Sequence, residues 1–181
     1  MYSPTTGFDN FIENPGSTVS AANFLETIQY GNITLKMEVW DTAGQEKYMA
    51  LNKIVYKGSK IVILTYDITN KQSFDSIESL WLPQVKECVD PNSVLCIAAN
   101  KSDKYNEEKV SEEIAKKYAE TINALYKQTS ALQGNGIKEL FNAAGKKYLE
   151  KIGEKIISPI DNKVKILSNT EKINGKKKKC C

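Results

Sequence analysis

The chain has 181 residues, of which 41% are hydrophobic and 26% charged, and this length and composition predict one domain with a tail. All 25 basic residues are lysines, and the lack of histidine excludes histidine-based acid–base catalysis. No segment approaches the roughly 20 apolar residues of a membrane span. The first residues also lack the basic and apolar regions of a signal peptide, so we expect a cytosolic protein.

Charge is concentrated at the C-terminal end. Residues 163–181 hold seven lysines and one glutamate, a net +6, which leaves −3 on the remainder because the whole chain carries +3. This pattern predicts a tail that meets an anionic surface. Nucleic-acid binding is disfavoured, because no aromatic residues interleave with the lysines. The spacing of Cys88, Cys96, Cys180 and Cys181 indicates neither a zinc site nor a disulfide framework.

Two strands are predicted early in the chain, over 24–33 and 34–40, with a turn at Gly31-Asn32 between them. Asp41 then lies at the carboxyl end of a strand, where ligands bind in open α/β sheets. Gly44 follows and offers a backbone amide with no side chain in its way. A carboxylate beside such an amide suits a phosphate with Mg²⁺, although a bare Asp-x-x-Gly is more often an ordinary polar turn.

The middle of the chain predicts a buried strand and a helix. The strand spans 60–67, where Ile61 to Leu64 form a continuous apolar run. The helix spans 73–88, with Ser73 as its cap and a kink at Pro83. Residues 45–57 lie between the strand that ends at residue 40 and the strand that begins at residue 60, and they are expected to be part helix and part loop.

The second half of the chain alternates strands with helices. A strand at 94–99 leads to Asn100-Lys101-Ser102-Asp103, and a short strand at 124–128 leads to Thr129-Ser130-Ala131-Leu132. Each four-residue motif alone is an ordinary turn. A helix is predicted to begin at Ser111, and another helix ends the domain. The residues expected on the apolar faces of these two helices are Ile114, Tyr118 and Ile122, and Ile137, Leu140, Phe141, Ala144 and Tyr148.

The stretch from Trp40 to Glu46, Trp-Asp-Thr-Ala-Gly-Gln-Glu, resembles the γ-phosphate-sensing motif of Ras-like small GTPases, and its surroundings resemble the Rab branch. The resemblance implies that Asp41 holds Mg²⁺ through water, that the Gly44 amide touches the γ-phosphate, and that Gln45 orients the attacking water. Thr18 resembles the first-switch threonine, which binds Mg²⁺ and the γ-phosphate. With no arginine in the chain, fast hydrolysis is expected to need help from another protein.

The two later motifs resemble the guanine-binding motifs of the same family. By this resemblance Asp103 accepts two hydrogen bonds from the base, Asn100 reads its other edge and ties loops together, and Lys101 packs its stem over the ring. Ser130 and Ala131 belong to the second motif, in which the Ala131 amide meets the base oxygen. The implied ligands are GTP or GDP with Mg²⁺. A carboxylate that faces two donors favours guanine over adenine, which would leave it unpaired at a cost of about 1 to 3 kcal/mol or more.

The expected fold is α/β, a three-layer GTPase-type sheet with helices on both faces. Polar motifs at 41, 67, 100 and 129 each follow an apolar run, which predicts one sheet that presents them along one edge. The family's first strand, its phosphate loop Gly-x-x-x-x-Gly-Lys-Ser/Thr and most of its first helix are missing from the 181 residues, and residues 1–17 predict irregular structure. We expect a GTPase domain over 1–153 and a flexible tail over 154–181.

The tail resembles the doubly prenylated end of Rab proteins, with Cys180 and Cys181 as the lipidated residues behind Lys176–Lys179. Two lipids meet the requirement for stable anchoring, and each lysine adds about 1 kcal/mol near anionic lipid. The implied partners are a prenylation escort, an exchange factor, an activating protein and effectors, with the protein a monomer. We expect it in the cytosol and on the cytoplasmic face of endomembranes.

Within the family, Tyr66-Asp67-Ile68-Thr69-Asn70 looks closest to endosomal Rabs. The effector-facing aromatic triad would fall on Asn23, Trp40 and Val55, so only Trp40 is retained. The leading hypothesis is therefore a Rab-like GTPase of vesicle traffic from a truncated sequence. The alternative is a membrane-tethered binding module that occupies Rab partners without turning over nucleotide.

Overall fold

The computed structural model describes residues 22–42 and 56–153, and every structural statement below concerns these residues. The predictions for Thr18, Gly44, Gln45, Cys180 and Cys181 lie outside them. The strands are β1 (Ala22–Tyr30), β2 (Ile33–Asp41), β3 (Ile61–Asp67), β4 (Val94–Asn100) and β5 (Leu125–Gln128). The helices are α2 (Lys71–Ser76), α3 (Leu82–Cys88), α4 (Glu112–Thr121) and α5 (Ile137–Lys151), with a π-helical turn η3 (Ile77–Trp81) and a 3₁₀ helix η4 (Ser102–Glu107).

Strands β3, β4 and β5 form a parallel sheet with β4 in the centre. Asp67 pairs with Asn100 and Ala99 with Gln128, so the three carboxyl ends lie level with one another. Along β4 the residues from Val94 to Ala99 are buried or nearly so, as the continuous apolar run predicts for a strand covered on both faces.

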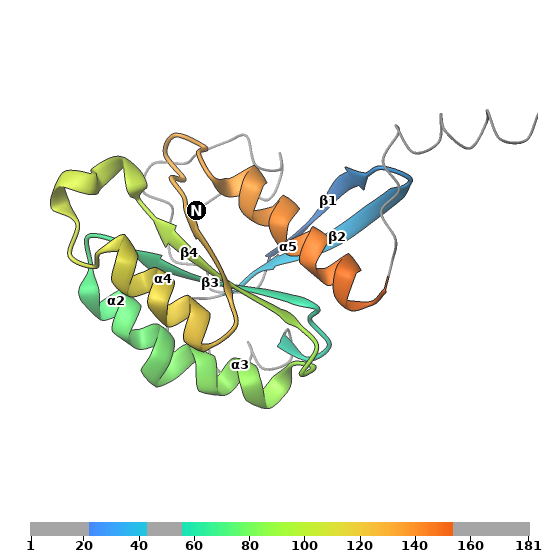
Figure 1. Cartoon of the computed structure of the whole chain (residues 1–181), viewed down its shortest axis with the longest axis horizontal. Helices are drawn as coiled ribbons and strands as arrows, with labels where there is room; N and C mark the ends of the chain where they lie inside the picture. The colour runs from blue at the N-terminus through green and yellow to red at the C-terminus, as the bar shows by residue number, and fades with distance from the viewer. Residues whose placement is uncertain (1–21, 43–55, 154–181) are drawn as a thin grey trace, which may run out of the picture.

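Helices cover both faces of this sheet and make it a three-layer α/β fold (Figure 1). One core lies between the sheet and the helices from α2 to α4, and its largest members are Tyr66, Ile68, Ile77 and Ile97. The other core lies between the sheet and α5 and contains Val94, Cys96, Ala98, Leu140 and Ala144. The fold class predicted from the sequence is therefore confirmed.

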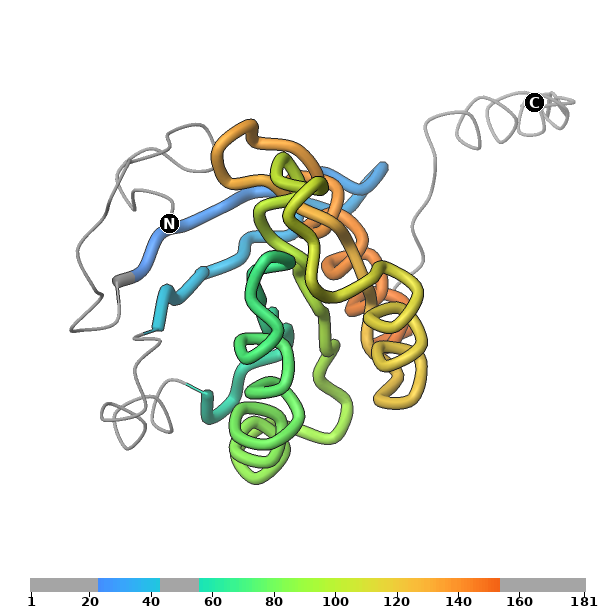
Figure 2. Tube along the Cα trace, turned by 90° about the vertical axis from the view of Figure 1, so that its left-hand side faces the viewer, coloured from blue at the N-terminus to red at the C-terminus, as the bar shows by residue number. Residues whose placement is uncertain are grey.

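The prediction of a single sheet is wrong for the described residues. Strands β1 and β2 form a separate antiparallel hairpin, with Tyr30 opposite Ile33 across the predicted turn. Figure 2 shows this hairpin in blue, apart from the teal strand β3. A groove of about 560 Å³ lies between β2 and β3, lined in part by Met37, Val39 and Ile61. The two sheets are separate because no described strand lies between β2 and β3 and pairs with both.

Helix α5 supports the hairpin. The Tyr30 hydroxyl donates a hydrogen bond of 2.7 Å to the backbone carbonyl of Asn142. At Gly145 the approach is so close that an added Cβ would lie 2.4 Å from Tyr30 Oη and 2.9 Å from Leu35 Cδ2. Burial raises the pKa of Tyr30 above its usual value, so its hydroxyl stays protonated at neutral pH.

The helical segment 71–88 differs from the sequence prediction at its cap and contains a turn that was not predicted. It begins at Lys71, with Asn70 at the N-cap, and the hydroxyl of Ser73 donates to the carbonyl of Asn70 at 2.6 Å. Its interior contains the π-helical turn, in which the Leu82 amide donates to the Ile77 carbonyl. Pro83 cannot donate and its ring crowds the carbonyl four residues earlier. The π-helical turn thus lies directly before the proline at which a kink was predicted, and such a widened turn leaves room for the proline ring.

Helix α4 follows its prediction at the cap but not along its whole apolar face. The Ser111 hydroxyl accepts from the Ile114 amide at 3.4 Å, as expected of a cap. Ile114 itself is exposed, and Ala115 and Ala119 take the buried positions beside the partly buried Tyr118. Because the side chains of Ala115 and Ala119 are small, α4 lies close to the sheet. Ile114, in the first turn of the helix, is exposed to solvent. The predicted face of α5 is confirmed at Ile137, Leu140 and Ala144.

The two described cysteines differ in their surroundings. Cys96 is fully buried between β4 and α5, and burial raises the pKa of its thiol to about 12, which makes it unreactive at neutral pH. Cys88 is half-buried at the end of α3.

None of the described helices combines the length and apolar character needed to cross a membrane.

Candidate functional site

Three loops meet where β3, β4 and β5 end. The Ile68 amide donates to the Asn100 carbonyl at 3.1 Å, and the Thr129 amide donates to the Ala99 carbonyl at 2.8 Å. The Ser102 amide donates to the Thr129 carbonyl at 3.0 Å. These bonds extend the parallel sheet into its loops, so the two polar motifs predicted at positions 100 and 129 are held side by side.

The side chain of Asn100 ties these loops together. Its Oδ1 accepts from the Ala131 amide at 3.1 Å and from the Thr129 hydroxyl at 3.5 Å. The sequence resemblance gives the Ala131 amide to a base oxygen, whereas the structure gives it to Asn100. A base oxygen at this place would therefore share the N–H group with Asn100.

Asp103 is joined to the second loop through Ser130. The fully buried Ser130 hydroxyl donates a short hydrogen bond to Asp103 Oδ1 and accepts from the Gln133 amide at 3.1 Å. The Ser130 amide in turn donates to the Asn135 carbonyl at 2.9 Å. Asp103 is thereby fixed in orientation by a donor from the protein, although it lies in the first turn of η4, a helix with no buried residues.

Lys101 is joined to the end of β3 by an ion pair with Asp67. Its backbone lies in the left-handed region, with φ of 64°, and its Nζ lies 2.6 Å from Asp67 Oδ2. Burial acts to raise the pKa of Asp67, but hydrogen bonds from Lys101 and Thr69 outweigh it, and the pKa is lowered. The lowered pKa keeps Asp67 charged at neutral pH, and the stability that this charge gives is lost only as pH falls through that value.

The structure thus brings Asn100, Lys101, Asp103, Ser130 and Ala131 into one cluster, as the sequence predicted. The cluster combines a carboxylate acceptor, an amide side chain and backbone N–H groups, which are donors and acceptors of hydrogen bonds at the carboxyl edge of the sheet. Asp41 lies on the other sheet, half-buried at the end of β2. Over 22–42 and 56–153 no three carboxylate, cysteine or histidine side chains gather closely enough to bind a metal.

Two contributors to the cluster were not predicted as site residues, although position 67 was predicted to lie at this edge of the sheet. Asp67 and Thr69 flank the end of β3 and contact Lys101 directly or through each other. The signal for Asp67 was present, because the residue ends an apolar run that pairs with the strand before Asn100. No pattern in the sequence indicated that its charge would face Lys101.

Comparisons with known proteins identify the family of this chain. Residues 7–150 match the model of the Ras family. The Ras-related protein RABF2b of Arabidopsis thaliana is 38% identical over 133 residues, which cover 74% of this chain and 66% of that protein. Human Ras-related protein Rab-22A is 39% identical over 133 residues, covering 74% and 68%. Ras-related protein Rab-5A of Dictyostelium discoideum is 36% identical over 178 residues, covering 95% and 84%.

The parallel sheet and the cluster at its carboxyl edge define an α/β protein of the nucleotide-binding class. The chain belongs to the Ras family of small GTPases, within its Rab branch and of the endosomal type. Its match to RABF2b spans just under two thirds of that relative's length.

Proposed function

We propose that this chain is a Rab-type switch that binds GTP or GDP with Mg²⁺ and regulates endosomal membrane traffic. The observation behind the proposal is the cluster in which Asn100, Asp103 and Ala131 are held by hydrogen bonds between two loops. Family membership supports the same ligand. The roles of Thr18, Gly44 and Gln45 toward phosphate, Mg²⁺ and water are part of this proposal.

The proposal is tested first at the base. We expect the 181-residue chain to bind GDP weakly, because its sequence contains no Gly-x-x-x-x-Gly-Lys-Ser/Thr phosphate loop. NMR titration with GDP and with ADP, each with Mg²⁺, measures such weak binding. The wild type should prefer GDP by about tenfold or more, since adenine offers Asp103 no pair of N–H donors and leaves its carboxylate with fewer hydrogen bonds. Asp103→Asn should lose this preference.

A matched control for this experiment is Glu107→Gln, which removes a carboxylate at the far end of the same helix η4. It should bind GDP and ADP as the wild type does. Equal affinity of the wild type for GDP and ADP would contradict the proposed ligand, whatever the variants do.

The exposed face of the β1–β2 hairpin supports a role in binding effectors. Leu25 is 76% exposed and Trp40 is 45% exposed on this face. Large apolar side chains so exposed on one face of a hairpin favour contact with a partner protein. Asn23 lies opposite Trp40 and donates to Glu38 at 2.9 Å, which gives the same face a fixed polar rim.

The membrane part of the proposal concerns Cys180 and Cys181, which we infer to be prenylated. Replacing both with serine should move the protein from the membrane pellet to the soluble fraction of cells, because the basic tail alone is a weak anchor. Cell fractionation with immunoblotting measures this, and Cys88→Ser is the control for loss of a thiol elsewhere. Continued pelleting of the double variant would exclude these cysteines as the anchor.

A further inference from the structure

We propose that Asp67, supported by Thr69, is a positioning residue that holds the stem of Lys101 across the carboxyl edge of the sheet as a platform for the base. The inference rests on the proposed guanine site. It adds to that site a residue from β3, a strand to which neither of the two base motifs belongs.

The first step is the direction of the Lys101 side chain. Lys101 directly follows β4, and Asp67 is the residue of β3 that pairs with its neighbour Asn100. Neighbouring strands are about 4.8 Å apart. An ion pair of 2.6 Å between Lys101 Nζ and Asp67 Oδ2 therefore draws the lysine side chain from one strand end to the next. The four methylene groups of the stem must span this interval.

The second step is the rigidity of Asp67. Its Oδ1 accepts from the Thr69 amide at 2.9 Å and from the Thr69 hydroxyl at 2.8 Å. Its own backbone amide donates to the Ser73 hydroxyl at 3.0 Å, and its carbonyl accepts from the Asn70 amide at 2.9 Å. One carboxylate oxygen is thus used for local fixation while the other meets Lys101. Charge-assisted bonds of this length are among the stronger polar contacts.

The third step concerns the mobility of the Lys101 side chain in the absence of its ion pair with Asp67. A lysine side chain has four rotatable bonds and loses considerable rotamer entropy when it is ordered. Half of the Lys101 side chain is exposed, so without Asp67 it would sample solvent. The left-handed backbone at Lys101 fixes where the stem begins, and Asp67 fixes where it ends. A base would then meet a stem that is already ordered and would not bear the cost of ordering it.

The variant Asp67→Asn isolates this effect. An asparagine oxygen can still accept both bonds from Thr69, while the oxygen that faces Lys101 is replaced by an uncharged NH₂ group that cannot accept from the lysine ammonium. Because the stem packs on the face of a base and does not read its edge, the loss should be equal for GDP and IDP, which differ in the 2-amino group. We expect affinity for both to fall about three- to tenfold, a modest loss for a partly exposed pair. Thr69→Val should give a smaller loss in the same direction.

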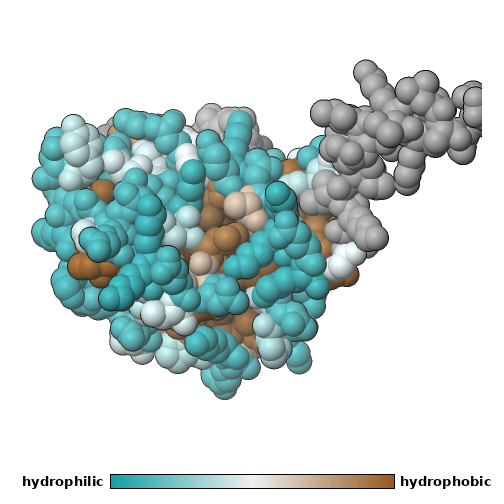
Figure 3. Space-filling model, in the orientation of Figure 1, coloured by the Kyte–Doolittle hydropathy of each residue, from teal (hydrophilic) through white to brown (hydrophobic). Residues whose placement is uncertain are grey.

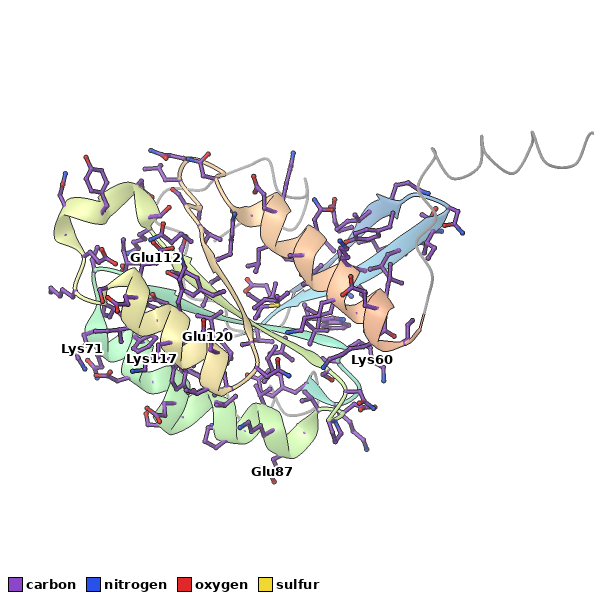
Figure 4. All side chains as sticks on the ribbon, in the orientation of Figure 1. Lys60, Lys71, Glu87, Glu112, Lys117 and Glu120 are labelled. Atoms are coloured by element: carbon purple, nitrogen blue, oxygen red, sulfur yellow. The ribbon has the colours of Figure 1, made fainter. Side chains whose placement is uncertain are left out.

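Asp75→Asn is the matched control, since Lys71 and Asp75 form an ion pair of 2.8 Å on the surface of α2. Lys71 lies on the outer surface in Figure 4. This variant should leave both affinities unchanged. Thermal unfolding of each variant checks that the fold is retained, and Thr69→Val provides the test if Asp67→Asn unfolds.

A readout without ligand completes the test. In ¹⁵N spectra of lysine ammonium groups, Lys101 should give a slowly exchanging signal that Asp67→Asn removes and Asp75→Asn keeps. Unchanged affinities in Asp67→Asn, or a loss for GDP much greater than for IDP, would overturn the inference while leaving the proposed guanine site intact. If the wild type shows no preference for GDP over ADP, the proposed function fails and the role of Asp67 toward a base fails with it.

Discussion

Replacing Gly136 by alanine is expected to lower the free energy of unfolding by about 3 to 5 kcal/mol, near the upper end for a single substitution. Gly136 precedes α5 in the left-handed region, with φ of 75°, where a residue with a Cβ is disfavoured. An added Cβ would also lie 2.0 Å from the carbonyl oxygen of Gln128 and 3.3 Å from Thr129 Cα. Backbone atoms cannot turn aside, so β5 or its loop must move.

Urea unfolding followed by tryptophan fluorescence measures this loss of stability. Gly58→Ala is the control, because Gly58 has a φ of 83° but nothing lies within 4 Å of its added Cβ. It should lose only about 1 kcal/mol, the conformational part of the penalty. Similar losses at the two sites would show that the contact with Gln128 does not matter. Gly136→Ala should also disturb the proposed base site, since the neighbouring Asn135 carbonyl accepts a hydrogen bond from the Ser130 amide.

The second large effect is expected at Gly145, where leucine should separate the β1–β2 hairpin from α5. Even the first carbon of the new side chain would lie 2.4 Å from Tyr30 Oη, so the tyrosine must leave its bond to the Asn142 carbonyl. Leucine favours helix by nearly 1 kcal/mol over glycine, so α5 itself should persist. Amide hydrogen exchange should show protection lost about a hundredfold in the hairpin, equivalent to about 2.7 kcal/mol of local opening, while β4 stays protected.

Ala143→Leu places the same side chain on the exposed face of the same helix and should leave the exchange of the hairpin unchanged. If Gly145→Leu also leaves the hairpin protected, the packing of Tyr30 against α5 does not hold the hairpin in place. Tyr30→Phe separates the two contributions, because it removes only the hydroxyl group and should cost about 1 kcal/mol.

Regular features of the fold were readable from the sequence because they follow from local patterns. The apolar run before Asn100 and the alternation from Leu35 to Val39 each predicted their strand. The motifs at 67, 100 and 129 were correctly predicted to lie along one edge, whereas the motif at 41 follows a strand of the other sheet. Apolar periodicity also gave the buried face of α5. These features depend on near neighbours in the chain or on the shared edge of a parallel sheet.

The features that sequence reasoning missed depend on contacts between distant residues. The ion pair of Lys101 with Asp67 joins positions 34 apart, and the π-helical turn before Pro83 reflects a steric conflict that periodicity does not register. Ile114 fits the apolar period of α4 as well as Ala115 does, and only the close packing of the helix on the sheet decides between them. Figure 3 shows hydrophobic residues in the region between α4 and α5, on a face that is mainly hydrophilic.

The division of the described strands into two sheets has a mechanical consequence. The hairpin and the parallel sheet have no strand pairing in common, and both pack against α5. A rotation of the hairpin against that helix would break the side-chain contacts of Tyr30 and Leu35 with α5 but no strand pairing within either described sheet. Asp41 ends one sheet and Asn100 ends the other. A ligand that contacts both residues would restrict this rotation of the hairpin. Its binding free energy would then include the conformational entropy that the hairpin loses.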